Sequence, residues 1–284
     1  MLGAIIGDTV GSIYEWHNIK TKEFPLFKST CFFTDDSILT CAVAEALMNG
    51  GTPDNFTDSL RAWARRYPKA DYGMGFRRWF KSDSRKGYNS VGNGSAMRVS
   101  ACGWICRPDE RQIGLEAARL SAEATHNSYG GIRGAVATTD CILMCRYYSE
   151  GYGVDESGKA LKDRITLDQW KAEIKAHIVK EYQYDLSKTV DEIRPTYYYH
   201  ETCDGTVEPA IVSFLESTDY EDAIRNAISL GGDSDTMAAI TGGIAEAAYG
   251  IPDWIKQKEF EFLDDTLKEL HVKWQKFLED KKRQ

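Results

Sequence analysis

Apolar residues recur along this chain at steps of three and four positions, the spacing of an α-helix that buries one face. The two clearest runs are Leu39, Val43 and Leu47, and then Met237, Ile240, Ile244 and Ala248. Nearly every periodic segment has this step, and convincing strand-like alternation of apolar and polar residues is absent. The pattern therefore predicts an all-α fold.

The same spacing predicts helices between stretches of weaker pattern. We expect helices over residues 3–16, 37–49, 54–67, two within 109–149, then 168–182, 210–215, 220–230 and a pair within 255–284. Residues 17–33 are predicted to be an extended connection, 150–167 an exposed loop, and the glycine-rich 68–98 mostly irregular. With 284 residues, one large helical domain is the first interpretation and two domains the second.

The amino-acid composition limits which partners the protein can bind and in which cell compartment it can act. The net charge of −8 argues against a nucleic-acid backbone as the main partner, because that affinity depends on clustered Lys and Arg. No stretch approaches the roughly 20 apolar residues of a membrane span, and the N-terminus lacks the basic leader of a secretory signal. Seven scattered cysteines indicate a reducing, cytoplasmic location. The pairs Cys102/Cys106 and Cys141/Cys145 are interpreted as core packing rather than zinc ligands.

Acidic clusters precede the two clearest apolar runs. Gly231 and Gly232 lead into Asp233-Ser-Asp235-Thr236, and Thr34-Asp35-Asp36 opens the helix expected at 37–49. One carboxylate at each site would suffice to cap a helix, and capping alone requires no ligand. Several closely spaced oxygens are also the ligand type that Mg²⁺, Mn²⁺ or Ca²⁺ prefers. For either cluster taken alone, capping and metal binding remain open.

The mirrored arrangement of the two clusters favours metal binding over helix capping alone. Two acidic helix starts that face each other repel unless a cation lies between them. Pairs of hard cations about 3.5–4 Å apart are a recurring device in hydrolysis, where they orient substrate oxygens and lower the pKa of bound water. The sequence therefore predicts a two-metal centre that joins the two ends of the chain.

Other polar residues have open interpretations. Asp8 and Glu15 are two turns apart and project to one helix face; we interpret Glu15 as functional and Asp8 as structural. Residues 89–98 form a small-residue loop of the kind that can approach a phosphate. His126 is a candidate either for a satisfied polar residue at a helix end or for a ligand contact. The tyrosines at 197–199 are predicted to form a packed edge that could border a site.

Five segments resemble the ADP-ribosylglycohydrolase family. They are GAIIGDTVGSIYE at 3–15, FTDDSIL at 33–39, GNGSAMRVS at 92–100, SAEATHNS at 121–128 and ISLGGDSDTMAAITGGIAEAAYG at 228–250. The resemblance spans almost the whole chain in the family's order. It implies one compact, orthogonal multi-helix domain over residues 1–284 with a central dinuclear site for two Mg²⁺ or Mn²⁺ ions.

The resemblance also implies site residues. Those implied as metal ligands are Thr34, Asp35, Asp36, Asp233, Asp235 and Thr236. Ser90, Gly92, Asn93, Gly94 and Ser95 match the diphosphate-binding loop, and His126 matches a histidine of the binding pocket. Glu15 matches the glutamate beside the metals. The implied reaction is hydrolysis at the anomeric carbon of ADP-ribose attached to a protein side chain or small molecule, with Glu15 and Asp36 sharing the proton transfers.

Three other functions are alternatives to this one. A terpene synthase needs a further acid three positions after its acidic pair, where Leu39 stands. HD-type phosphohydrolases need histidines beside the aspartate, and none is present there. A catalytically weak ADP-ribose-binding or regulatory protein of the same fold is the remaining alternative. Val91 replaces an aromatic residue that stacks on adenine in the serine-type enzymes, so adenine recognition must differ.

Overall fold

The computed structural model describes residues 1–283. In them the chain forms α-helices joined by loops and short 3₁₀ turns, with no β-sheet and a single isolated bridge between Gly92 and Thr202. This confirms the all-α prediction. The helices are α1 (Leu2–Gly11), α2 (Asp35–Met48), α3 (Pro53–Arg66), α4 (Met74–Lys81), α5 (Gly94–Met97), α6 (Arg111–Glu123), α7 (Tyr129–Ser149), α8 (Leu167–Tyr182), α9 (Val190–Ile193), α10 (Cys203–Leu215), α11 (Tyr220–Ser229), α12 (Ser234–Tyr249), α13 (Asp253–Glu259) and α14 (Asp265–Lys282).

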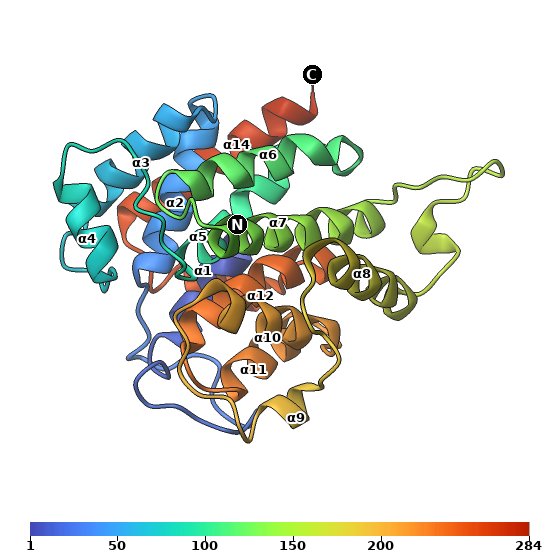
Figure 1. The fold of residues 1–284 in the computed structure, drawn as a ribbon. Helices are drawn as coiled ribbons and strands as arrows, with labels where there is room; N and C mark the ends of the chain where they lie inside the picture. The colour runs from blue at the N-terminus through green and yellow to red at the C-terminus, as the bar shows by residue number, and fades with distance from the viewer. Residues whose placement is uncertain (284) are drawn as a thin grey trace.

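Helices α1 and α12 form the centre of the molecule (Figure 1). Every residue of α1 is buried, because its small and apolar side chains leave no polar face. Three glycines spaced four residues apart, Gly3, Gly7 and Gly11, face α12 along one stripe. A Cβ added to Gly7 would lie 2.0 Å from the carbonyl oxygen of Ala238, closer than any real contact. The two backbones therefore touch, which only glycine permits.

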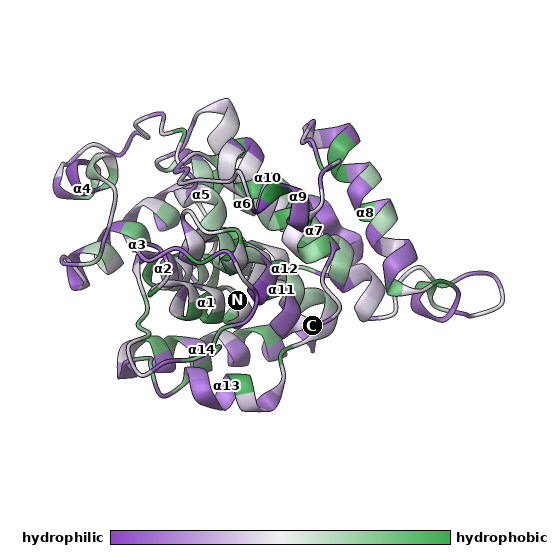
Figure 2. Ribbon diagram, turned by 90° about the horizontal axis from the view of Figure 1, so that it is seen from below, coloured by the Kyte–Doolittle hydropathy of each residue, from purple (hydrophilic) through white to green (hydrophobic). Residues whose placement is uncertain are grey.

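The remaining helices bury apolar residues on either side of this central pair. One cluster joins α12 to α7, α10 and α11, and a second joins α2, α3, α6 and α14. Figure 2 shows the consequence: α1 and α2 are mainly hydrophobic, whereas peripheral helices such as α8 and α13 also carry hydrophilic stretches. No helix in the described part is both long enough and apolar enough to cross a membrane.

Three predictions about local structure were wrong. The helix expected over residues 3–16 ends at Gly11, so Glu15 follows α1 and does not share a helix face with Asp8. Residues 68–98 contain α4 and α5, although they were predicted to be mostly irregular. In α4, Phe76, Trp79 and Phe80 are buried on one face, a stripe too short to stand out among the surrounding glycines. Helix α10 begins at Cys203, earlier than expected, and contains Pro209 in its interior.

Pro209 is tolerated because a side chain replaces the helix hydrogen bond that proline cannot make. Proline has no N–H to donate to the carbonyl four residues earlier, which here belongs to Gly205. The hydroxyl of Tyr197 donates to that carbonyl oxygen at 2.9 Å. A distant contact therefore satisfies the acceptor that the local sequence leaves free.

All seven cysteines are buried and free, as the packing interpretation expected. In the described residues no cysteine belongs to a group of side chains that could hold a metal ion.

The contact between α1 and α12 makes Gly7 a sensitive position. In an open helix, Gly→Ala stabilises by roughly 0.5–1 kcal/mol. Here we expect Gly7→Ala to lower the free energy of unfolding by about 2 kcal/mol or more, because the added methyl forces the helices apart. Urea unfolding followed by circular dichroism measures this change. Gly73→Ala is the control, since nothing lies within 4 Å of an added Cβ there; equal stability of the two variants would contradict the prediction.

Candidate metal centre and active site

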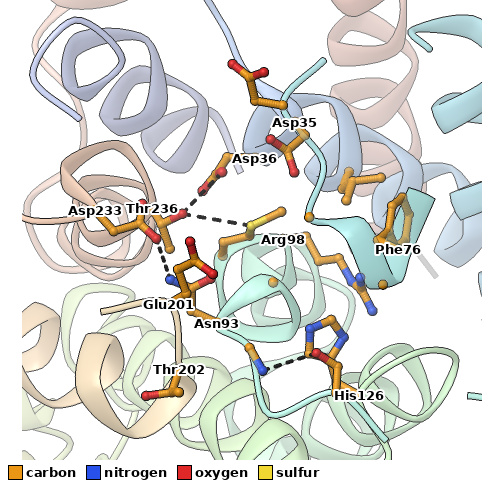
Figure 3. A pocket seen from close by; sticks show the side chains of 18 of the residues that line it. Asp35, Asp36, Phe76, Asn93, Arg98, His126, Glu201, Thr202, Asp233 and Thr236 are labelled. Carbon is orange, nitrogen blue, oxygen red and sulfur yellow. Dashed lines mark hydrogen bonds between the residues drawn. The ribbon is translucent and has the colours of Figure 1, made fainter. Parts of the chain in front are cut away.

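The two acidic helix starts face each other at the centre of the molecule (Figure 3). Carboxylate oxygens of Asp8, Asp36 and Asp235 lie within 4.8 Å of one another, and so do those of Glu15, Asp233 and Asp235. Asp235 belongs to both triads. The side chains come from α1 and the turn after it, the start of α2, and the start of α12. The structure thus brings together acids from opposite ends of the chain, as the facing of the two clusters predicted.

Asp8 holds the first turn of α2 in place. Its carboxylate accepts hydrogen bonds from the backbone N–H of Thr34 at 2.9 Å and of Ser37 at 3.1 Å. The hydroxyls of both residues also donate to it. Four donors from one helix start explain why a fully buried acid is tolerated there. The structural interpretation of Asp8 fits these contacts, although its carboxylate also belongs to one of the triads.

The other predicted ligands differ in how they face the centre. The hydroxyl of Thr236 donates to Asp36 Oδ2 at 3.3 Å, while Asp36 Oδ1 is buried without any hydrogen-bond partner. Thr34 turns its hydroxyl toward Asp8 and caps α2 through the N–H of Asp36. Asp35 is half-buried and lies outside both triads. An orphaned carboxylate oxygen in this position is what a bound cation would satisfy.

The electrostatics of the centre also fit a cation. Burial, followed by repulsion from Asp8 and Asp233, raises the pKa of Asp35 to about 8. Burial likewise raises the pKa of Asp36 and Asp235 well above the ordinary range, and neighbouring carboxylates add to both shifts. Among the described residues, no lysine or arginine forms an ion pair with these acids. An all-oxygen donor set with this excess of negative charge suits a hard divalent ion.

A loop at residues 89–95 borders the acids. Asn93 donates from its side-chain amide to Asp233 Oδ2 at 2.7 Å, which links the loop directly to the acidic centre. Cβ atoms added to Gly92 and Gly94 would lie within 3.5 Å of His126 Nε2, so the small residues let the loop pack against this histidine. Ser95 is buried behind the loop and donates to the carbonyl of Gly131 at 2.7 Å.

His126 and Arg98 lie across the cavity from the acids (Figure 3). Burial, together with the charge of Arg98, lowers the pKa of His126 well below its usual range, so the ring is neutral. Arg98 is fully buried and donates to the Ser121 carbonyl and the Thr125 hydroxyl. Its Nε and Nη1 have no partner. A buried guanidinium with two unsatisfied nitrogens is a strong attraction for an anion.

Glu15 lines the cavity and is half-buried. The hydroxyl of Tyr199 donates to its Oε1 at 2.9 Å, and the ring of Tyr199 stacks on Trp16 with centroids 5.3 Å apart. Burial raises the pKa of Glu15 to about 7, against the hydrogen bond from Tyr199, which lowers it. One residue of the predicted tyrosine edge therefore does border the site.

These groups line one cavity of about 590 Å³. It is lined by Glu15, Asp35, Asp36, Ser90, Gly92, Asn93, Gly94, His126, Asp233, Asp235 and Thr236 of the residues predicted from sequence. Thr34 and Ser95 lie behind its wall. Arg98, Asp71 and Tyr199 also line it. The sequence interpretation gave no role to Arg98 or Asp71, and it placed Tyr199 only in an edge that could border a site. Arg98 stands at the end of the small-residue segment 89–98, whereas nothing near Tyr199 in sequence indicates its contact with Glu15.

Comparison with known proteins shows to which family the chain belongs. A sequence model of ADP-ribosylglycohydrolases matches residues 1–280. The chain belongs to the ADP-ribosylglycohydrolase family. Membership confirms both the resemblance and the expectation of an enzyme of glycohydrolase type.

The similarity to several known proteins extends over most of this glycohydrolase. ADP-ribosylhydrolase ARH3 of Homo sapiens is 28% identical over 97% of this chain and 93% of its own. ADP-ribosylarginine hydrolase Tri1 of Pseudomonas putida is 23% identical over 90% and 72%. A solved structure named "ADP-ribosylglycohydrolase-related protein complex" superposes with a TM-score of 0.69 at 19% identity, covering 98% of this chain and 95% of that one. The last likeness shows the shared fold.

Stability of the metal-free glycohydrolase should depend on pH. The pKa of Asp8 is raised to about 6 and that of Asp35 to about 8, both from 3.8. Between about pH 4 and 8 the folded state therefore binds more protons than the unfolded state, so the free energy of unfolding falls as pH rises. In EDTA we expect the melting temperature to be lower at pH 8 than at pH 5. Mg²⁺ should raise it more at pH 8, where the carboxylates have lost their protons.

Thermal unfolding followed by tryptophan fluorescence measures this pattern. Asp235→Asn is the control, because it removes the carboxylate shared by both triads and should abolish most of the Mg²⁺ response. A melting temperature of the unmodified chain that is indifferent to Mg²⁺ at pH 8 would contradict the assignment of this cluster as a metal centre.

Proposed function

We propose that this chain, acting as one domain over residues 1–284, hydrolyses the bond between an acceptor and the anomeric carbon of ADP-ribose. The acceptor is a modified protein side chain such as serine or arginine, or a small ADP-ribosyl conjugate, and ADP-ribose is released. The human and Pseudomonas relatives are named for ADP-ribosyl and ADP-ribosylarginine hydrolysis, which supports this substrate class. The buried free cysteines support action in the cytoplasm.

The observation that carries the proposal is the division of the cavity into two electrostatic halves. One half consists of carboxylates from α2, α12 and the turn after α1. The other contains the loop at 89–95, the neutral His126 and the unsatisfied guanidinium of Arg98. ADP-ribose has the matching division, since its diphosphate is anionic and its terminal ribose offers neutral hydroxyls that metal ions can bind.

The acidic half is proposed to hold two Mg²⁺ ions, with Mn²⁺ as an alternative, through Thr34, Asp35, Asp36, Asp233, Asp235 and Thr236. Two overlapping triads that share Asp235 support two neighbouring positions. Ions bound there would fix the ribose hydroxyls and polarise a water molecule. Thr34 donates its hydroxyl hydrogen to Asp8, which leaves the lone pairs of its oxygen for an ion, whereas Asp35 lies outside the triads.

The other half is proposed to bind the diphosphate. The segment from Ser90 to Gly94 forms one wall, with Ser95 buried behind it, and the glycines at 92 and 94 let a phosphate approach the backbone. Arg98 supplies the positive charge from beneath, and His126 donates or accepts as a neutral ring. Asn93 joins the two halves through its hydrogen bond to Asp233, so binding of the diphosphate and position of the acids are coupled.

Glu15 is proposed as the general base. It lines the cavity and is only half-buried, so water can reach it, and Tyr199 fixes its orientation. Asp36 is buried and bound by Thr236, which suits assistance to the departing group rather than exchange with solvent. In the reaction Glu15 removes a proton from water as the oxygen bonds to the anomeric carbon, the bond to the acceptor breaks, and the acceptor takes its proton from the carboxyl group of Asp36.

Product release from defined acceptors tests the function. The protein is incubated with Mg²⁺ and, separately, serine- and arginine-ADP-ribosylated peptides, and free ADP-ribose is measured. We expect release from at least one acceptor, and we expect Asp235→Ala to abolish both release and metal binding. Tight binding of ADP-ribose without any release would favour the regulatory alternative. An Asp235→Ala variant that binds two ions and turns over at the native rate would refute the metal assignment.

Tyr199 provides a test of the role of Glu15. Tyr199→Phe keeps the ring that stacks on Trp16 but removes the hydrogen bond to the carboxylate, and such a bond to a charged group contributes about 1.5–3 kcal/mol. We expect kcat to fall about tenfold or more, with little change in KM, because the ADP-ribose contacts remain. Tyr198→Phe is the control, since Tyr198 is 68% exposed and does not contact Glu15. A native kcat in Tyr199→Phe would show that Glu15 needs no such support.

A further inference from the structure

Positive charge is concentrated in one segment of an otherwise acidic chain. Residues 61–86 contain nine Lys and Arg but two Asp, whereas the whole chain contains 35 basic and 43 acidic residues. The rest of the chain is therefore left with 26 basic against 41 acidic residues. The segment comprises the end of α3, the loop that follows, and α4 with its own loop. Such asymmetry indicates an electrostatic docking surface.

Most of these cations are free to meet a partner. Six of them are exposed, and in the described part of the chain none forms an ion pair within 4 Å: Arg65, Arg66, Lys69, Arg78, Lys81 and Lys86. Arg85 differs, because it already binds Asp54 and Asp58. Unpaired charges of one sign on a neighbouring group of side chains repel each other, and an acidic partner would relieve this repulsion.

An apolar groove runs from this basic segment to the proposed metal centre. It has a volume of about 480 Å³ and is lined by Phe32, Ile38, Tyr67 and Pro68, with Arg66 and Lys69 beside them. Phe32 is 50% exposed, which is unusual for so large an apolar side chain. Thr34 and Asp71 also belong to the groove, and Asp71 lines the catalytic cavity as well. The groove and the cavity therefore adjoin at Asp71.

We propose that this groove, named here the acceptor groove, binds the polypeptide that carries the ADP-ribose, and that Arg66 and Lys69 select acceptors with acidic residues near the modified side chain. The inference rests on the proposed function. If the ribose lies at the acids and the diphosphate at the loop, the acceptor must leave from the opposite side of the ribose. Asp71 lines both the cavity and the groove, and Thr34, beside the acids, lines the groove.

The lining favours a peptide over a nucleic acid. Single-stranded nucleic acids bind through aromatic faces on which bases stack. Of the groove's aromatic rings, Phe32 alone offers an exposed face. The ring of Tyr67 is already stacked on Trp63 and packed against Phe33, and its hydroxyl donates to Asp264, so the groove has no row of free rings for successive bases. Ile38, Pro68 and Ala70 complete an aliphatic floor that suits the side chains of an extended polypeptide. The carboxylate of Asp71 repels acids at the junction itself, so the preferred acids lie farther along the peptide, near Arg66 and Lys69.

Three peptides of equal length test the proposal. Each carries ADP-ribose on the same central residue, flanked by acidic, neutral or basic residues, and kcat/KM is measured with Mg²⁺ at low salt. We expect the acidic peptide to be hydrolysed with the highest kcat/KM. The double variant R66E/K69E should lower kcat/KM for that peptide roughly threefold to tenfold, since each exposed charge pair contributes modestly. Hydrolysis of the ADP-ribosylated amino acid without a peptide should be unchanged, which also shows that the variant is folded.

A matched control changes the same charge elsewhere. Lys159 and Lys175 are exposed and lie outside the cavity and the groove, and α8, which carries Lys175, lies at the far side of the molecule from α4 (Figures 1 and 2). K159E/K175E should leave all three peptides unaffected. An equal loss in this variant, or equal kcat/KM for the three peptides, would overturn the proposal.

Failure of this proposal can be told apart from failure of the proposed function. If the isolated ADP-ribosylated amino acid is hydrolysed but the peptides show no charge preference, only the acceptor groove is wrong. If no conjugate is hydrolysed, the proposed function fails, and the inference that rests on it falls too. A single-stranded oligonucleotide of equal charge that displaces a fluorescent acidic peptide at a lower concentration than the unlabelled peptide would assign the surface to nucleic acid and overturn the peptide reading.

Discussion

The close contact between α1 and α12 is the constraint on which the rest of the structure depends. Gly3, Gly7 and Gly11 let one helix backbone lie on the other, and an added Cβ at Gly11 would come within 2.5 Å of the Cα of Asp235. Any larger residue on this stripe would separate the two helices by the thickness of a side chain. Because Asp8 is on α1 and Asp235 on α12, that separation would also pull the carboxylate triads apart.

Repulsion among the buried acids destabilises the centre, and contacts with the surrounding fold must offset this cost. Buried carboxylates repel one another, and burial raises the pKa of each. The hydrogen bonds to Asp8 from Thr34 and Ser37, and from Asn93 to Asp233, fix the acids where they are despite this repulsion. A rigid site that is short of positive charge has a high affinity for a hard cation, because little reorganisation is needed when the ion arrives.

Two kinds of feature could be predicted from the sequence. The first is a helix with regular apolar spacing, and the second is a cluster of acids that is stable only when it meets a cation. Helices α2, α7 and α12 follow from regular apolar spacing, and two acidic helix starts need a cation only if they meet. The contacts that escaped prediction are made across the fold. Tyr199 reaches Glu15 from a segment 184 residues away, and Tyr197 supplies the hydrogen bond that lets α10 include Pro209. Neither contact leaves a periodic signal, since each depends on how separate helices pack.

The pairing of first and last segments has a consequence for synthesis on the ribosome. Asp36 and Thr236, which share a hydrogen bond, are separated by 200 residues. At about 5–20 residues per second, translation of that interval takes roughly 10–40 s. Throughout it the nascent chain carries α1, a helix without a polar face, and no α12 to cover it. The emerging polypeptide is therefore a natural client for chaperones that shield apolar segments, and its ion-binding centre can close only near the end of translation.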